Sequence, residues 1–262
     1  MNLPRLSLFE FNDAPWAPRV IRETIVEALS RMLAWGGVLR GLVGPFEDFV
    51  ARSGATEILD LAAGAGGPAG IFVDEILRAG RTPPRFLLTD LHPQLHAWEA
   101  ARAARPGMID FVDVPVDATC IPEHLSRGRA RVIINALHHL PPEIARSIFV
   151  DAVESRAPIF VAEGFDRNPL GFASMAPVGL AALLATPLLS ERHRLAKALL
   201  TYGTPAVLAI SAWDGVVSTL RIYEREDLEA MVAPLGNGYT WTWGHYTFPV
   251  GGRGYYFHGV PG

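Results

Sequence analysis

The chain has 262 residues, of which 50% are hydrophobic and 19% charged, and this balance excludes an intrinsically disordered protein. Asp and Glu outnumber Lys and Arg by 27 to 23, so we expect no nucleic-acid partner, because such a partner calls for a basic surface. The only cysteine, Cys120, excludes an internal disulfide and a cysteine-based zinc site. The early acids Glu10 and Asp13 interrupt any signal-like apolar core, and we therefore expect a cytoplasmic protein.

Residues 1–54 are predicted to form an N-terminal helical cap on a larger core. Apolar residues recur at helical spacing from Val20 to Leu33. Pro18 suits the first turn of this helix, and the Gly36-Gly37 pair ends it.

Residues 55–165 alternate short apolar runs with helical stretches, which is typical of a parallel sheet covered by helices on both faces. The predicted strands are 57–61, 85–90, 109–113, 131–135 and 159–163, and the predicted helices are 68–79, 93–104 and 141–155. Four of these strands end in a polar residue, namely Asp60, Asp90, Asn135 and Glu163. Ligands of open α/β sheets bind at the carboxyl ends of strands, so these side chains predict a binding site.

Residues 166–220 form an apolar helical insertion, with no charge from Asn168 to Ser190 or from Ala198 to Trp213. The first run has the length of a membrane span, but its three prolines argue against one. We interpret the insertion as a lid of two short helices over an apolar pocket. A peripheral membrane contact through Arg192, His193, Arg194 and Lys197, or a homodimer interface, would use the same surface.

Residues 221–262 complete the sheet of the core. A helix is predicted at 224–233, followed by two aromatic runs, 239–243 and 254–260, that are separated by Gly and Pro. Such runs favour an antiparallel hairpin.

The sharpest motif is the stretch ILDLAAGAGG at 58–67, in which a strand runs into a turn of small residues before a helix. Small side chains let a ligand approach the backbone, and the helix N-terminus offers free amides. With Asp90 beyond it, the pattern also satisfies a dinucleotide fingerprint. Asp60 disfavours a pyrophosphate at this turn because its charge lies close by. A purely structural strand-to-helix turn is the remaining alternative.

This stretch resembles the cofactor loop of class I S-adenosylmethionine-dependent methyltransferases, and the resemblance covers 55–165 and 219–262. It implies a mostly parallel, seven-stranded Rossmann-like sheet with an antiparallel C-terminal hairpin. The usual motif has Gly where this chain has Ala62. The resemblance implies an S-adenosyl-L-methionine site formed by Asp60, Ala62, Gly64, Gly66, Asp90, Leu91, Asp117, Ala118 and Asn135.

The same resemblance suggests the catalytic groups. In small-molecule O-methyltransferases a catalytic histidine follows the fourth strand, and a glutamate that ends the fifth strand steadies it. On that pattern His138 is the base and Glu163 its partner, with His139 as the second candidate. The alternative is that these histidines only pack or cap the next helix.

We therefore expect methyl transfer to a small, largely apolar or aromatic acceptor, at oxygen, with no metal ion. The candidate acceptor-binding residues are Phe11, Trp16, Trp213 and Arg221. One alternative is a nicotinamide-dependent oxidoreductase, although none of the six tyrosines has the lysine four residues on that a proton relay requires. The other is a non-catalytic cofactor-binding or membrane-associated protein on the same fold.

Overall fold

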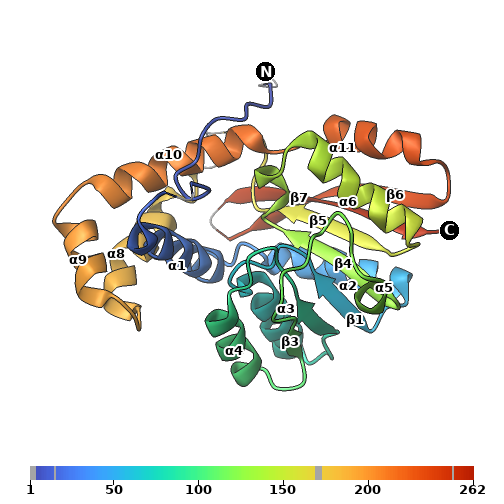
Figure 1. Ribbon diagram of the computed structural model, residues 1–262, viewed down its shortest axis with the longest axis horizontal. Helices are drawn as coiled ribbons and strands as arrows, with labels where there is room; N and C mark the ends of the chain where they lie inside the picture. The colour runs from blue at the N-terminus through green and yellow to red at the C-terminus, as the bar shows by residue number, and fades with distance from the viewer. Residues whose placement is uncertain (1–3, 15, 169–172, 250) are drawn as a thin grey trace. The chain divides into compact units, whose positions relative to one another are not determined.

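The computed structural model describes residues 4–14, 16–168, 173–249 and 251–262 of the chain (Figure 1). The chain divides into two compact units, each assembled from three separate segments. The helical unit consists of Met1–Val38, Phe165–Ile222 and Thr247–Arg253, and the sheet unit of Leu39–Gly164, Tyr223–Tyr246 and Gly254–Gly262. We describe each unit by itself.

A seven-stranded sheet forms the centre of the sheet unit, with the strand order β3-β2-β1-β4-β5-β7-β6. The first five strands are parallel, and β7 pairs antiparallel with β5. The strands are β1 (Glu57–Asp60), β2 (Arg85–Leu88), β3 (Ile109–Phe111), β4 (Arg129–Ile134), β5 (Ile159–Glu163), β6 (Tyr239–Phe248) and β7 (Gly252–Pro261). The predicted sheet and its C-terminal hairpin are thus confirmed.

Helices cover both faces of this sheet. Successive strand residues point to opposite sides, so apolar side chains project from both faces and have to be buried on each. On one face, Phe46 of α2 stacks on Phe72 of α3 and contacts Phe160 of β5. On the other face, Phe149 of α6 meets Trp241 and Phe257 of the hairpin. The helices of this unit are η1 (Arg40–Leu42), α2 (Val43–Ser53), α3 (Gly67–Arg78), α4 (Leu95–Ala104), α5 (Glu123–Ser126), η2 (Leu137–His139), α6 (Pro142–Glu154), α11 (Arg225–Val232) and η3 (Ala233–Leu235).

His258 is a buried histidine of β7 in the aromatic layer of the first face. Its ring packs against Phe49, Phe160 and Tyr256. Burial, with a smaller contribution from the charge of Arg52, lowers the pKa of His258 to about 4. The folded protein therefore holds this side chain neutral at pH values where an unfolded chain would protonate it.

We expect His258 to make the folded state acid-sensitive. Its pKa is depressed in the folded state, so the unfolded chain binds the proton first, and stability falls as the pH drops from about 6.5 to about 4. The loss amounts to about 3 kcal/mol by linkage. His258→Phe should remove that part of the pH dependence in urea unfolding measured at pH 7 and pH 4. The exposed His96→Phe is the control and should follow the wild type; equal slopes for all three proteins would contradict the assignment.

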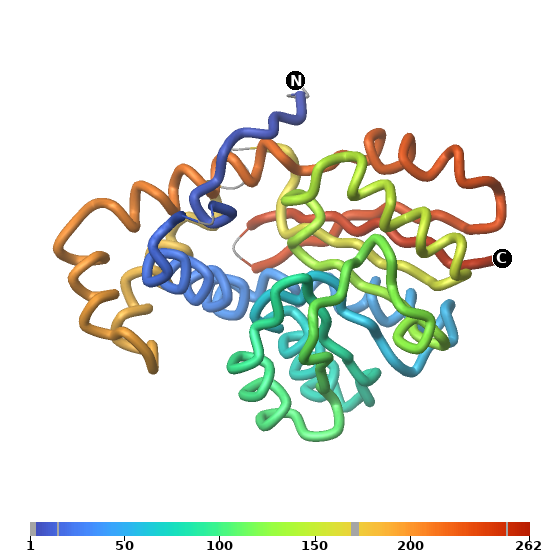
Figure 2. Tube along the Cα trace, in the orientation of Figure 1, coloured from blue at the N-terminus to red at the C-terminus, as the bar shows by residue number. Residues whose placement is uncertain are grey.

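The helical unit contains α1 (Arg19–Trp35), α8 (Ala176–Leu189), α9 (Arg194–Tyr202) and α10 (Ala206–Arg221). Helices α8 and α9 form a hairpin that leads into α10 (Figure 2). The predicted lid segment thus holds three helices in its described part. Its core joins α1 to the insertion through Ile21, Ile25, Ala28, Leu183 and Val207. The predicted cap 1–54 gives α1 to this unit and α2 to the sheet unit.

Within the described residues, no single helix is both long and apolar enough to cross a membrane. The consecutive helices α9 and α10 meet the length and composition criteria only as a pair, and they are bent by 80° at their junction.

Candidate functional site

The turn after β1 is a tight loop with three residues in the left-handed region, Ala62 at φ 54°, Gly64 at 53° and Gly66 at 76°. The left-handed φ of Gly66 favours glycine. A Cβ on Gly66 would also lie 2.9 Å from Cδ1 of Leu88, so a larger residue would require that side chain to move. The indole Nε1 of the buried Trp98 donates to the Gly64 carbonyl at 2.8 Å. No heavy atom lies within 4 Å of a Cβ built on Gly64. The loop therefore holds a fixed shape and leaves open space above its middle residue.

Ala62 stores backbone strain that the usual glycine of this motif would avoid. A left-handed conformation costs an L-residue about 1 kcal/mol or more, whereas glycine adopts it freely. We expect Ala62→Gly to raise the free energy of unfolding by about 0.5–1 kcal/mol, after the greater freedom of glycine in the unfolded chain is deducted. Urea denaturation is the measurement. The matched control is Ala65→Gly in the same loop, where φ is not positive, and it should lower stability.

Two carboxylates flank this loop at the carboxyl ends of β1 and β2. Asp60 is 2% exposed, and burial followed by the charge of Asp90 raises the pKa of Asp60 well above its usual range. Asp90 accepts the Gly64 N–H at 2.9 Å and the His92 N–H at 2.8 Å, one on each oxygen. A carboxylate offers about four acceptor sites, so Asp90 retains capacity for further donors. Asp60 is a site where a ligand cation would relieve an unfavourable buried charge.

The segment after β3 comes to the same edge. The Val116 N–H donates to the Asp90 carbonyl at 2.9 Å, which fixes the neighbouring Asp117 next to this strand end. Asp117 itself closes a turn by accepting the Thr119 N–H at 2.8 Å and the Thr119 hydroxyl at 2.7 Å, and these bonds lower its pKa. Two further candidates, Leu91 and Ala118, directly follow Asp90 and Asp117, and Leu91 is exposed.

Asn135 ends β4 in a left-handed conformation, at φ 55°. Its Oδ1 accepts the Gly164 N–H at 2.6 Å, so the side chain bridges the ends of β4 and β5. Its Nδ2 is buried and has no hydrogen-bond partner among the described residues. Buried donors in native proteins are nearly always paired. Among the described residues, the Asn135 amide is therefore available to an additional acceptor.

His138 and Glu163 form a buried pair just beyond β4 and β5. The Glu163 carboxylate lies 2.9 Å from Nδ1 of His138 and accepts the His138 backbone N–H at 3.1 Å. The His139 ring lies 4.1 Å from the His138 ring, centroid to centroid, and is half-buried. The structure thus gives His138 the carboxylate partner that the sequence suggested. A carboxylate at Nδ1 favours the tautomer that keeps the proton there, which leaves Nε2 as the acceptor nitrogen.

The four predicted acceptor-binding residues gather around the N-terminal segment of the helical unit. Phe11 and Trp16 form an aromatic cluster with Phe9, whose ring stacks on Trp16 at 5.7 Å. Trp213 of α10 donates to the Phe9 carbonyl at 2.8 Å. Arg221 at the end of α10 donates to the Leu8 carbonyl at 2.6 Å. These bonds hold Leu8 and Phe9 along α10.

Arg221 and Asp214 of α10 both bind the N-terminal segment. Arg221 pairs with Asp13 at 2.6 Å and with Glu10 at 3.2 Å. Asp214 accepts the backbone N–H groups of Phe11 at 2.9 Å and Asn12 at 3.0 Å. Both side chains therefore secure the N-terminal segment. No local pattern signals these bonds, because the partners lie about 200 residues apart.

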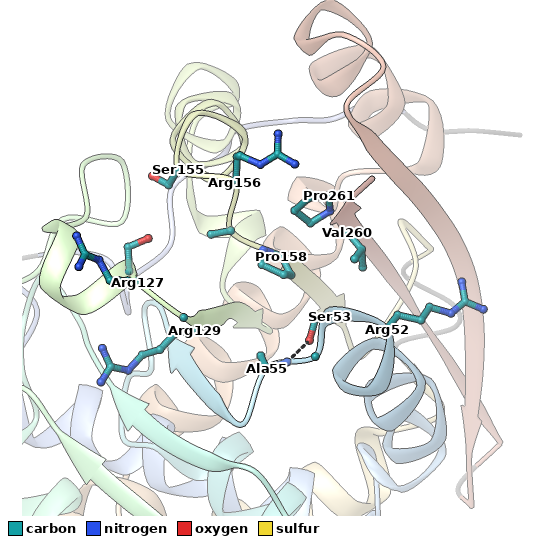
Figure 3. Close-up of a pocket in the computed structure, with 14 residues that line it drawn as sticks. Arg52, Ser53, Ala55, Arg127, Arg129, Ser155, Arg156, Pro158, Val260 and Pro261 are labelled. Atoms are coloured by element: carbon teal, nitrogen blue, oxygen red, sulfur yellow. Dashed lines mark hydrogen bonds between the residues drawn. The ribbon is translucent and has the colours of Figure 1, made fainter.

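The structure also has a hollow of about 430 Å³ at the other edge of the sheet, where β1, β4 and β5 begin (Figure 3). Four arginines surround it, Arg52, Arg127, Arg129 and Arg156, but in Figure 3 their side chains fan outward from its centre. Arg129 already binds Glu57 and the carbonyls of His124 and Leu125. This hollow is separate from the polar strand ends, and we assign it no function.

Comparison with known proteins places this arrangement in a structural class. No family model matches the chain, and no curated protein matches its sequence. Solved structures match it over most of its length. The methyltransferase domain of bacterial CtHen1 has a TM-score of 0.52 and 12% identity, over 85% of this chain and 99% of that one.

Two further structures were solved with a cofactor form bound. The plantazolicin methyltransferase BpumL, in complex with SAH, has a TM-score of 0.52 and 9% identity over 92% of this chain and 99% of that one. The O-methyltransferase NcsB1 from neocarzinostatin biosynthesis, in complex with S-adenosylmethionine and 2-hydroxy-5-methyl naphthoic acid, has a TM-score of 0.53 and 13% identity. That match covers 93% of this chain and 58% of NcsB1. The chain therefore has the fold of S-adenosylmethionine-dependent methyltransferases.

Proposed function

We propose that this protein transfers a methyl group from S-adenosyl-L-methionine to a small, largely apolar or aromatic acceptor, at an oxygen atom. The observation that carries the proposal is the edge where the Gly64 N–H is bonded to Asp90 and where the buried Asn135 amide has no partner among the described residues. The fold of the solved methyltransferases supports the same reaction class.

The residues at this edge fit the parts of that cofactor. The remaining acceptor sites of Asp90 suit the two ribose hydroxyls, and the exposed Asp117 with Ala118 suits the adenine edge. The buried Asp60 suits the cationic amino-acid end, because a positive charge would favour its ionised form. The Asn135 amide would donate to the carboxylate of that same end. Gly64, Gly66, Ala62 and Leu91 would form the surface against which the cofactor lies.

The bound cofactor supplies an electrophilic methyl group on a sulfonium, and the protein has to place the acceptor oxygen in line with it. The Nε2 atom of His138 would take the proton of the acceptor hydroxyl, while Glu163 holds the ring and stabilises the imidazolium that results. His139 is the second candidate for the base. The acceptor site would include Phe11, Trp16, Trp213 and Arg221. Arg221 would act indirectly, by holding the N-terminal segment through Leu8 and Asp13.

Calorimetric titration with S-adenosylhomocysteine, the product form of the cofactor, tests this proposal. Micromolar binding is expected. Titration with NADH, followed by nicotinamide fluorescence, should give no binding. Binding of NADH without binding of S-adenosylhomocysteine would replace the proposal with the oxidoreductase alternative. Binding of neither ligand would favour a non-catalytic protein on this fold. If the cofactor binds, release of S-adenosylhomocysteine in a screen of hydroxylated aromatic and apolar compounds identifies the acceptor.

A further inference from the structure

Helix α9 of the helical unit turns an apolar stripe outward and a lysine inward, while its Leu200 packs against the core. Its apolar residues Leu195, Leu199 and Tyr202 are 74%, 62% and 52% exposed. Lys197, the only lysine of the chain, lies on the opposite face and is fully buried. A surface helix of a globular protein normally turns its apolar face to the core. The exposed side of α9 therefore has the composition of a face that is covered in the working protein.

This orientation of α9 is fixed by a buried polar network. The Lys197 ammonium donates to Glu27 of α1 at 2.5 Å and to the Ser190 hydroxyl at 3.2 Å. Ser190 also donates to Glu27. Although burial opposes it, these bonds lower the pKa of Glu27, so the carboxylate stays charged. Rotating α9 to bury its leucines would expose this network and break an ion pair, so the leucines remain outside.

The exposed apolar residues of α9 continue onto α8. Leu180, Leu184 and Leu188 recur at four-residue spacing on the exposed side of α8. Two bonds tie the exposed sides of the helices together, from the Tyr202 hydroxyl to the Leu184 carbonyl and from Arg194 to the Leu188 carbonyl, each at 2.6 Å. We call the resulting surface the leucine face; it consists of Leu180, Leu184, Leu188, Leu195, Leu199 and Tyr202.

The charges near the leucine face are basic and sit at one end of it. The turn between α8 and α9 carries Arg192, His193 and Arg194, all exposed, with Glu191 as its only acid. The net charge of the whole helical unit is also positive. The helical unit contains ten Lys and Arg against seven Asp and Glu, a formal charge of +3, whereas the sheet unit has a formal charge of −7.

From these observations we propose that the leucine face docks on the surface of an anionic lipid bilayer, with Arg192 and Arg194 meeting lipid phosphates. An apolar helix face that ends in arginines is suited to the interface, where leucines enter the acyl boundary and guanidinium groups bind phosphate. The opposite charges of the two units favour the helical unit as the side that faces such a membrane.

A second copy of the chain is the other occupant of this surface, and the charges disfavour it. In a two-fold dimer the same surface contacts itself, so two units of formal charge +3 would be brought together. An anionic bilayer is attracted by the same charge. The experiment below distinguishes the two.

Co-sedimentation of the full chain with vesicles of phosphatidylcholine containing 30% phosphatidylserine tests the proposal. The wild type should bind these vesicles at least tenfold more tightly than vesicles of pure phosphatidylcholine. Leu195→Gln with Leu199→Gln should weaken binding at least tenfold, because two leucines lose their burial in the acyl boundary. Arg192→Gln with Arg194→Gln should weaken it about tenfold or more at low salt.

The control is Leu77→Gln with Ile144→Gln, two exposed apolar residues on the sheet unit, and binding should not change. Circular dichroism verifies that every variant is folded, and analytical ultracentrifugation gives the oligomeric state. A folded wild type that does not bind anionic vesicles overturns the proposal, as does equal binding by the leucine variant. A dimer that the leucine variant converts to monomers, without vesicle binding, assigns the surface to a second copy.

Discussion

Replacing His138 with Gln is expected to lower the rate of methyl transfer at least 100-fold, which corresponds to an activation free energy about 3 kcal/mol higher. The affinity for S-adenosylhomocysteine should stay within about threefold. The reason is the geometry of the pair. Glu163 occupies Nδ1 of His138, which leaves Nε2 to take the proton of the acceptor hydroxyl. Glutamine fills a similar volume but does not accept a proton at neutral pH. Release of S-adenosylhomocysteine with the acceptor identified by screening is the measurement.

The companion variants separate a base from a buried structural histidine. Glu163→Gln should slow transfer, because the imidazolium formed in the reaction loses its stabilising carboxylate. His139→Gln should keep most of the activity. An unchanged rate in His138→Gln, with the loss appearing in His139→Gln, would transfer the role to the neighbouring ring. A structural role alone would lower the melting temperature of both the His138 and Glu163 variants and weaken cofactor binding along with transfer.

Asp90→Ala is expected to reduce the affinity for S-adenosylhomocysteine at least 100-fold. Hydrogen bonds to a charged carboxylate contribute about 1.5–3 kcal/mol each, and two ribose hydroxyls would be left without an acceptor. The same substitution frees the Gly64 N–H, so the loop also loses a contact that fixes its shape. Calorimetric titration measures the effect.

Asp90→Asn provides the graded comparison for this site. The amide oxygen can still accept one donor, so the affinity should fall about tenfold, between the wild type and Asp90→Ala. Asp113→Ala, at an exposed acid after β3 with no assigned contact to the cofactor, should leave the affinity unchanged. Equal affinities for the wild type and Asp90→Ala would remove Asp90 from the binding site and leave the loop with a purely structural role.

The sheet could be predicted because its central parallel strands β1, β4 and β5 are buried on both faces and therefore read as short apolar runs with a polar end. The glycine loop could be found from its small residues alone. What the sequence does not contain is the conformation of Ala62, which shows its strain only once φ is known. The partners of Arg221 were also beyond reach, because Glu10 and Asp13 approach it from the far end of the chain.

The orientation of α9 shows a different limit of sequence analysis. Helical periodicity tells which residues share a face, and it correctly groups Leu195, Leu199 and Tyr202. It does not tell which face is covered. The usual assumption places leucine inside and lysine outside, and here the ion pair of Lys197 with Glu27 on another helix reverses that outcome. Long-range polar contacts decided the orientation, and these are absent from any local window.

The segmented construction of the helical unit has a consequence for synthesis on the ribosome. Helix α1 leaves the exit tunnel early, but the helices that cover its apolar side begin about 140 residues later. At about 5–20 residues per second this is a delay on the order of ten seconds. During that interval Ile21, Ile25 and Ala28 lack their packing partners Leu183 and Val207. The ribosome is meanwhile synthesising residues 39–164 of the sheet unit, which lie between α1 and α8 in the sequence. The apolar side of α1 thus stays uncovered on the nascent chain until α10 has emerged.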